Sequence, residues 1–299
     1  MLVLPFTHCY VSTNETLQHI VDFIRVYQMP VLMFISGVFV KIEYNQMKSW
    51  LGKRGRRLLM PGIIWSILFF WKDILYSFNL QLIDYILTTV TWFLFVLFVF
   101  NVFIYLWSFL YCQTNKTVPF YFFCVIVAGA LYCISLISNI SFVSLLAWHW
   151  VFFSLGFMLK TMVEADSIKD ASNYLTLLVF FLLTITLLVL TKNLEMNQSS
   201  FIRYILLIAV RYVDSIFGII MIVIFANLVP RCLKSCCTFV SKSSMYIYLT
   251  HLVFIQMSFG VNPYIEMLVK WSLGVGVALL IAFMADKYNL KMVKFIYGG

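Results

Sequence analysis

The chain has 299 residues, of which 63% are hydrophobic and only 11% are charged. A soluble domain carries roughly 25% charged residues, so the polar side chains here are too few to cover a globule that faces water on all sides. The formal net charge of +9 does not indicate a nucleic-acid-binding protein, because the lysines and arginines lie in short connections between apolar runs. We therefore expect an integral membrane protein with no nucleic-acid partner.

The apolar runs predict an all-α fold, a polytopic transmembrane helix bundle of about ten spans that forms one membrane-embedded domain over residues 1–299. The first span is expected to be partial, because the apolar run at 1–11 is shorter than the ~20 residues that a spanning helix needs. The other spans are expected at 26–42, 58–77, 84–111, 118–137, 142–160, 174–191, 202–229, 244–260 and 265–285.

The connections between the runs predict the orientation of the chain. The connection 43–57 is strongly basic, and cytoplasmic connections carry the excess of Lys and Arg. If this connection is cytoplasmic, alternation places the other basic connections, such as 231–242, on the same side. The connections expected on the opposite side include 78–83 and 138–141, which have no Lys or Arg. Both termini are therefore expected in the cytoplasm.

Ionisable side chains in or beside a span are costly there and are candidates for function. His8 follows the first apolar run, and a neutral imidazole at this place could take a proton from a hydroxyl as a general base. A histidine that is merely hydrogen-bonded at a helix end is the alternative.

A second candidate is the cluster of basic side chains that precedes the apolar run starting at Pro61. The guanidinium fork of arginine matches phosphate oxygens, so an anionic cytosolic ligand or lipid headgroups would suit this cluster. A purely topological role is the alternative. The cluster consists of Lys53, Arg54, Arg56 and Arg57.

Four further ionisable residues inside apolar runs stand out. Arg211 and Asp214 are three residues apart, so they are expected to share a helical face, either as a structural ion pair or as the lining of a polar path. His251 could line a cavity or could be a packed, hydrogen-bonded histidine. His149, between two tryptophans, is assigned no role. The cysteines at 232, 236 and 237 have no histidine at zinc-ligand spacing, so no metal site is expected.

Six features of the chain occur in the order found in a known family. They are His8, VYQMPVLMFISGVF (Val26 to Phe39), KRGRRLLMP (Lys53 to Pro61), TWFLFVLFV from Thr91, WVFFSLGFML from Trp150 and SSMYIYLTHL from Ser243. Together they resemble the integral-membrane acyltransferases often called type 3, which O-acylate bacterial surface polysaccharides and related cell-envelope molecules.

The resemblance implies a multi-pass protein of the bacterial plasma membrane that uses a cytosolic acyl-CoA, most often acetyl-CoA, as donor. The basic cluster would hold the phosphates of the donor, and His8 would deprotonate a hydroxyl of a glycan or lipid-linked glycan acceptor. Such a direct transfer requires no metal and no bound cofactor.

The chain departs from the family pattern at two positions. The family carries an arginine roughly three helical turns before its first-span histidine, and this chain begins too late to contain it. The family histidine of the MP segment is Gln28 here. Two other hypotheses therefore stay open beside the O-acyltransferase. One is a transporter or flippase for a polymer precursor, with a path lined by Arg211, Asp214 and His251. The other is an inactive, truncated member of the family. If instead the start site is set too far downstream, the O-acyltransferase hypothesis stands.

Overall fold

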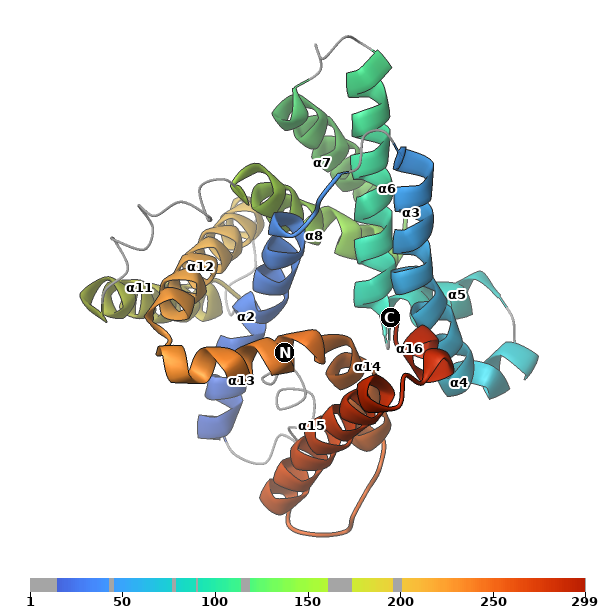
Figure 1. The fold of residues 1–299 in the computed structure, drawn as a ribbon. Helices are drawn as coiled ribbons and strands as arrows, with labels where there is room; N and C mark the ends of the chain where they lie inside the picture. Colours follow the sequence, from blue (N-terminus) through green and yellow to red (C-terminus); the bar gives the residue numbers. More distant parts are fainter. Residues whose placement is uncertain are drawn as a thin grey trace.

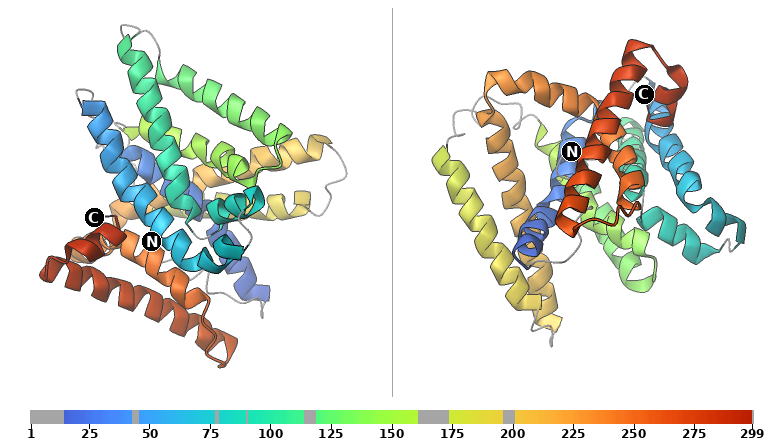
Figure 2. Two further views of the ribbon diagram at one scale, coloured as in Figure 1. Left: turned by 90° about the vertical axis from the view of Figure 1, so that its right-hand side faces the viewer. Right: turned by 90° about the horizontal axis from the view of Figure 1, so that it is seen from below.

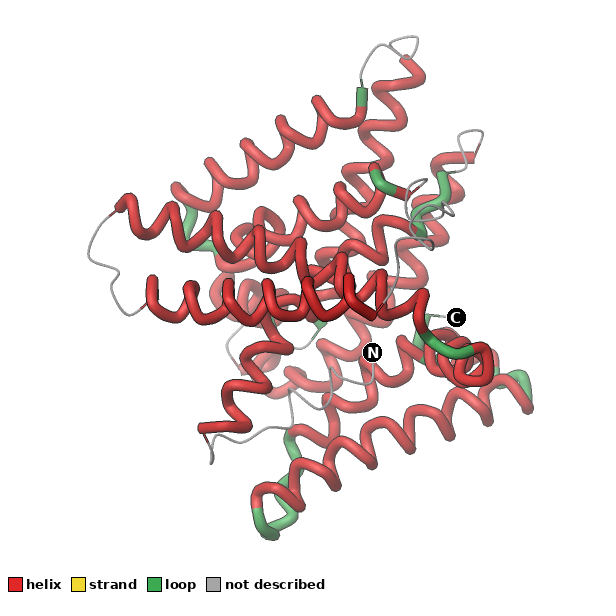
Figure 3. Tube along the Cα trace, turned by 90° about the vertical axis from the view of Figure 1, so that its left-hand side faces the viewer, coloured by secondary structure: helices red, strands yellow, loops and turns green. Residues whose placement is uncertain are grey.

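The computed structural model describes residues 15–42, 46–76, 79–89, 91–113, 119–160, 174–195 and 201–298. Within these ranges the chain forms helices and no strand (Figure 3). This confirms the predicted all-α fold. The helices are α2 (Glu15–Val38), α3 (Met47–Arg54), the π-helix η2 (Gly55–Leu59), α4 (Met60–Tyr76), α5 (Leu80–Thr88), α6 (Trp92–Gln113), α7 (Phe120–Ile137), α8 (Ser141–Met158), α11 (Tyr174–Glu195), α12 (Phe201–Leu228), α13 (Arg231–Lys242), α14 (Ser244–Ile255), α15 (Pro263–Lys287) and α16 (Lys291–Ile296).

By length and composition, seven helices in the described ranges can cross a membrane, and two apolar helices, Tyr27–Val38 and Ser244–Ile255, are shorter. Each span predicted after the first one overlaps one of these helices. A helix suits lipid because its backbone N–H and C=O groups are already hydrogen-bonded to each other. The partial span predicted at 1–11, which contains His8, lies outside the described residues.

The basic connection predicted at 43–57 is largely helical, which corrects the expectation of a loop. Helix α3 starts at Met47 and continues through η2 into α4, so Met47–Tyr76 is one helix of 30 residues. Lys and Arg are good helix formers, and their long side chains can reach water from a helix end. The charges therefore did not require the helix to stop. The connection predicted at 231–242 is likewise a helix, α13.

The single span predicted at 84–111 is divided into α5 and α6. The hydroxyls of Thr88 and Thr89 donate hydrogen bonds to carbonyl oxygens of the preceding turn (2.8 and 2.7 Å). The hydroxyl of Thr91 is instead hydrogen-bonded to that of Ser66 in α4 (2.7 Å). Threonine hydroxyls compete for backbone partners and β-branched side chains are stiff, so a run of threonines is a weak point in a helix.

Helix α2 runs through the middle of the bundle, with the α11–α12 hairpin on one side and α6 on the other (Figure 1 and the right-hand view of Figure 2). It begins at Glu15, earlier than the predicted start at 26. Pro30 lies inside this helix and removes one backbone donor.

Helices α2 and α8 cross in close contact through two glycines. A Cβ atom at Gly37 would overlap the carbonyl oxygen of Phe153, and a Cβ atom at Gly156 would overlap that of Phe34. Small residues allow two helix backbones in a membrane to approach closely. Gly37 belongs to the ISG segment and Gly156 to the FFSLG segment, so two family-like segments far apart in the sequence meet at this crossing.

The end of the chain packs against the start of α4. Gly298 has a φ of +79°, and a Cβ atom there would overlap the carbonyl oxygen of Arg57. Tyr297 packs edge-on against Trp65 (ring centroids 5.5 Å apart), and its hydroxyl is hydrogen-bonded to Thr250 (3.1 Å). Burial raises the pKa of the Tyr297 phenol above its usual value, so the hydroxyl stays neutral. These contacts hold the basic segment in place from the C-terminal side.

Candidate functional site

A cavity of about 660 Å³ lies beside the basic cluster, and we call it the rim pocket. Its walls come from α2 and the residues just after it, from the α3–η2 helix, and from α6, α8, α13 and α14. Helix α13 crosses over α2 and closes one side (Figure 1). The lining residues are Leu32, Ile35, Ser36, Phe39, Val40, Arg54, Leu58, Phe93, Leu97, Asn101, Phe153, Cys236, Cys237, Val240, Ser241, Ser244, Met245 and Tyr248.

Of the four basic side chains predicted to bind phosphate, Arg54 is the one that lines the rim pocket. It is half-buried, and its guanidinium carbon lies 5.6 Å from the ring centroid of Trp50. The Trp50 ring is itself fixed, because its Nε1 donates a hydrogen bond to the carbonyl oxygen of Lys41 (2.7 Å). A cation over an indole face is favourable, so Trp50 orients Arg54. The exposed members of the cluster are Lys53, Arg56 and Arg57.

The cluster spans the π-helical turn η2. A π turn inside an α-helix shifts the faces of the helix and is frequent at functional sites. Arg54 just before η2 and Leu58 within it both line the rim pocket. Arg56 and Arg57, between them in the sequence, stay exposed. One cation therefore reaches the pocket while its neighbours remain in the surrounding solvent.

Asn101 supplies a polar group to the apolar inner part of the rim pocket. Its side chain is 3% exposed, and its Nδ2 donates a hydrogen bond to the carbonyl oxygen of Leu97 (2.6 Å). Its Oδ1 is buried and has no hydrogen-bond partner among the described residues. A buried acceptor without a partner costs about 1–3 kcal/mol. A ligand that brings an N–H or O–H donor to this oxygen would remove that cost.

Tyr248 forms the wall of the rim pocket on the α14 side, with its ring 5.5 Å from that of Phe93. His251, predicted to line a cavity, follows one turn later on α14. It is 1% exposed, its Nδ1 is hydrogen-bonded to the carbonyl of Ile247 (2.9 Å), and it packs against Gly274 of α15. His251 lies behind the wall that Tyr248 forms and lines neither the rim pocket nor the second cavity described next.

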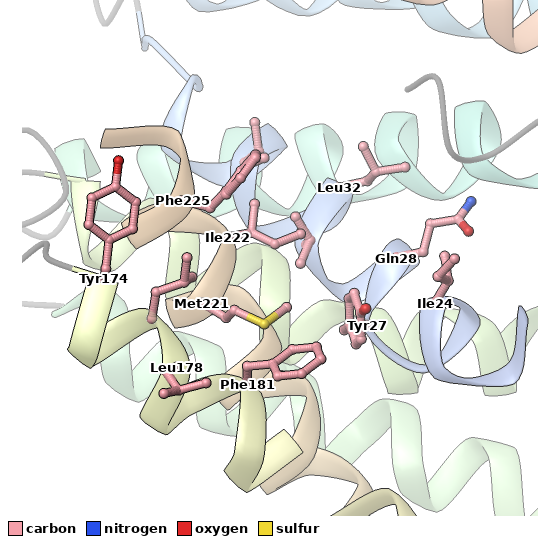
Figure 4. Close-up of a pocket in the computed structure, with 13 residues that line it drawn as sticks. Ile24, Tyr27, Gln28, Leu32, Tyr174, Leu178, Phe181, Met221, Ile222 and Phe225 are labelled. Carbon is pink, nitrogen blue, oxygen red and sulfur yellow. The ribbon is translucent and has the colours of Figure 1, made fainter. Parts of the chain in front are cut away.

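A second cavity of about 670 Å³, which we call the lateral groove, lies between α2 and the α11–α12 hairpin. Figure 4 shows the side chains of α11 and α12 facing those of α2 across it. Its lining is almost wholly apolar. The lining residues are Ile24, Tyr27, Gln28, Val31, Leu32, Ile35, Tyr174, Leu177, Leu178, Phe181, Met221, Ile222 and Phe225.

Arg211 and Asp214, predicted to share one face of a helix, differ in their surroundings. Asp214 is 2% exposed, and its Oδ1 has no hydrogen-bond partner among the described residues. Arg211 is exposed. One turn after Asp214, Gly218 packs against the side chain of Tyr27. Neither Arg211 nor Asp214 lines the rim pocket or the lateral groove, so the polar path proposed for a transporter gains no support from these cavities.

The sequence patterns did not single out several residues that line the rim pocket, namely Asn101, Tyr248 and the two cysteines of α13. Asn101 interrupts the apolar run FVFNVF, and any polar side chain inside a span is costly. That interruption was the available signal. The role of Cys236 and Cys237 in lining the pocket had no local signal, because it depends on where α13 packs.

His8, the predicted general base, lies outside the described residues. In the part of the chain that the structure describes, no group of three or more His, Cys, Asp or Glu side chains could hold a metal ion. The residues gathered at the rim pocket combine one arginine with a mostly apolar lining.

Comparison with known proteins shows the family to which the chain belongs. A family model described as an acyltransferase domain matches residues 3–286, nearly the whole chain. No curated protein and no solved structure matches it. The matched range contains the basic cluster, both glycines of the α2–α8 crossing and all the residues of the rim pocket. With its apolar helices long enough to span a bilayer, the chain belongs to the type 3 family of membrane acyltransferases.

Proposed function

We propose that the protein transfers an acyl group from an acyl-CoA to a hydroxyl of a cell-surface polysaccharide or of its precursor. We place it in the plasma membrane of a bacterium with both termini in the cytoplasm, where the excess of basic residues belongs. The observation that carries this proposal is the rim pocket, which combines an oriented arginine with a buried, unsatisfied amide oxygen.

The basic cluster suits the phosphates of the donor. Arg54 can form paired, charge-assisted hydrogen bonds with phosphate oxygens. The neighbouring exposed cations Lys53, Arg56 and Arg57 raise the local concentration of an anion, and this attraction weakens as salt increases.

Asn101 suits the pantetheine arm of the donor, which carries secondary amides. An amide N–H of the arm can donate to Oδ1 of Asn101 and satisfy an acceptor that is otherwise unpaired. The apolar side chains around it, such as Leu97 and Phe153, suit the methylene groups of the arm. The donor would thus enter beside Arg54 with its thioester end directed toward α2.

Transfer requires one base and no change in oxidation state. The acceptor hydroxyl oxygen attacks the thioester carbonyl carbon, a C–O bond forms, and the C–S bond breaks. We assign the base to His8, on the family resemblance. It takes the hydroxyl proton and returns it to the departing sulfur, so the products are an ester and free CoA.

The donor half of the proposal predicts that CoA shields Cys236 from modification. The full chain is reconstituted in lipid nanodiscs as two variants, each of which retains one cysteine. Cys236 lines the rim pocket, whereas Cys232, one turn earlier on α13, does not, and both are exposed. Acetyl-CoA is expected to slow the reaction of a maleimide with Cys236 and to leave that of Cys232 unchanged. Equal rates with and without acetyl-CoA at Cys236 would exclude donor binding at this pocket.

The transfer half predicts loss of acyl esters from the surface polysaccharide in cells that make His8→Ala. The imidazole is replaced while the basic cluster stays, so donor shielding of Cys236 is expected to persist when acylation is lost. The ester content of isolated polysaccharide and the protein level in the membrane are measured together. Normal ester content at normal protein level would contradict the assignment of His8. Loss of polymer export with normal esters would favour a transporter.

A further inference from the structure

The rim pocket and the lateral groove are neighbours that share two wall residues. Leu32 and Ile35 of α2 line both cavities. The same helix gives Ser36 to the rim pocket alone and Gln28 to the groove alone. One side of α2 therefore forms a continuous wall from the basic cluster into the membrane-embedded part of the bundle.

We propose that the lateral groove binds the hydrocarbon chain of the acyl donor, so that the protein uses a medium- or long-chain acyl-CoA rather than acetyl-CoA alone. This inference rests on the proposed function, because it requires the CoA part of the donor in the rim pocket. When the donor is bound in this way, its thioester lies near Leu32 and Ile35, where the two cavities meet.

The lining of the groove fits a hydrocarbon chain. The side chains of Leu178, Phe181, Met221 and Phe225 surround it from the α11–α12 hairpin (Figure 4). A hydrocarbon chain needs no hydrogen-bond partners and gains free energy in proportion to the apolar area that it removes from water. A sugar or a phosphate would leave its polar groups unpaired against these side chains.

The shared wall favours the donor over a separate lipid as the source of this chain. A separate lipid would need a headgroup site at the end of the groove, whereas both ends of a long-chain acyl-CoA have a place. Its charged part lies beside Arg54, and its chain continues past Ile35 along α2.

The length of the groove gives the chain length. Ile24 and Ile35 both line it and are eleven residues apart on α2, which corresponds to about 16 Å at the helical rise. An extended alkyl chain with carbon–carbon bonds of about 1.5 Å advances about 1.25 Å per carbon. We therefore expect the best donor to carry an acyl group of about twelve carbons.

The test compares acetyl-CoA with dodecanoyl-CoA by the concentration that half-protects Cys236 from maleimide in nanodiscs. Dodecanoyl-CoA is expected to protect at a concentration at least about tenfold lower. Replacing Leu178 by Trp is expected to fill the groove and remove this advantage while leaving protection by acetyl-CoA unchanged. Met221→Trp, from the other helix of the hairpin, is expected to act in the same way.

The matched control is Leu182→Trp, one turn further along α11, which is about as exposed as Leu178 but does not line the groove. This variant is expected to keep the advantage of the long chain. If the advantage persists equally in all three variants, it comes from partition of dodecanoyl-CoA into the bilayer, and the inference is wrong. Equal protection by the two donors in the unmodified protein also overturns it but leaves the proposed function intact. Absence of protection by either donor overturns the proposed function itself.

Discussion

Replacing Arg54 by Gln is expected to raise the acyl-CoA concentration that half-protects Cys236 by roughly 10- to 100-fold. A hydrogen bond to a charged group contributes about 1.5–3 kcal/mol, and each 1.4 kcal/mol corresponds to a factor of ten. Arg54 is the residue of the basic cluster that lines the rim pocket, and Trp50 holds its guanidinium in one orientation. The loss should therefore change little with added salt, because it removes a direct contact.

The matched control for Arg54 is Lys48→Gln, which removes one positive charge from an exposed site on the same helix, α3. Its effect is expected to be small and to vanish at high salt, since exposed charges are screened over about 10 Å at 0.1 M. An equally large loss in Lys48→Gln would mean that net charge, and not the rim pocket, attracts the donor.

Protection of Cys236 by the fragment of CoA that lacks the pantetheine arm distinguishes the contact with Arg54 from the contact with Asn101. Arg54→Gln should weaken protection by this fragment and by intact CoA, because both carry phosphates. Asn101→Leu should weaken protection by intact CoA alone, because the fragment has no pantetheine amide to donate to the side chain.

The second large effect is expected for Gly156→Ala, which should destabilise the fold by about 3 kcal/mol or more. The new methyl group would overlap the carbonyl oxygen of Phe34 and would lie 2.8 Å from its carbonyl carbon. Both are backbone atoms, so no side chain can rotate away, and α2 and α8 must separate. Stability is measured by heating the protein in detergent and recording the monodisperse peak on size-exclusion chromatography. The temperature at which half of this peak is lost should fall markedly.

Gly129→Ala is the control, because a Cβ atom on Gly129, also in an apolar helix, would meet nothing within 4 Å. Its stability should be unchanged or slightly higher, since Ala favours helix over Gly. Gly37→Ala should act like Gly156→Ala, because it perturbs the same crossing from the other helix. If Gly156→Ala and Gly129→Ala are equally stable, the close crossing of α2 and α8 is not correct.

The α2–α8 crossing also sets the shape of the rim pocket. Leu32 and Ser36 of α2 and Phe153 of α8 line the pocket on either side of the glycine contact. Separation of the two helices would move these walls apart, so Gly37→Ala should weaken donor binding as well as stability.

The positions of the spans could be predicted from the sequence because hydrophobic length is a local property. Runs such as 118–137 and 174–191 match helices closely, since lipid requires a long apolar helix wherever such a run enters it. Local chemistry also shows where predictions of this kind fail. A helix ends at the threonines after α5, although the apolar run continues. Conversely, helix α3 extends through a charged segment that contains lysines and arginines.

The sequence by itself determined that this protein is a helical membrane protein of the acyltransferase family, with a cluster of basic side chains at one end of a span. Only the tertiary structure decided that Arg54, and not its three basic neighbours, lines the rim pocket. It also decided that Asn101 and α13 line the same pocket, and that the glycines at 37 and 156 lie at one close crossing of α2 and α8. The physical reason is that apolar helices in lipid carry little sign of which side faces a neighbour. Their rotation is fixed by close packing with helices distant in the sequence.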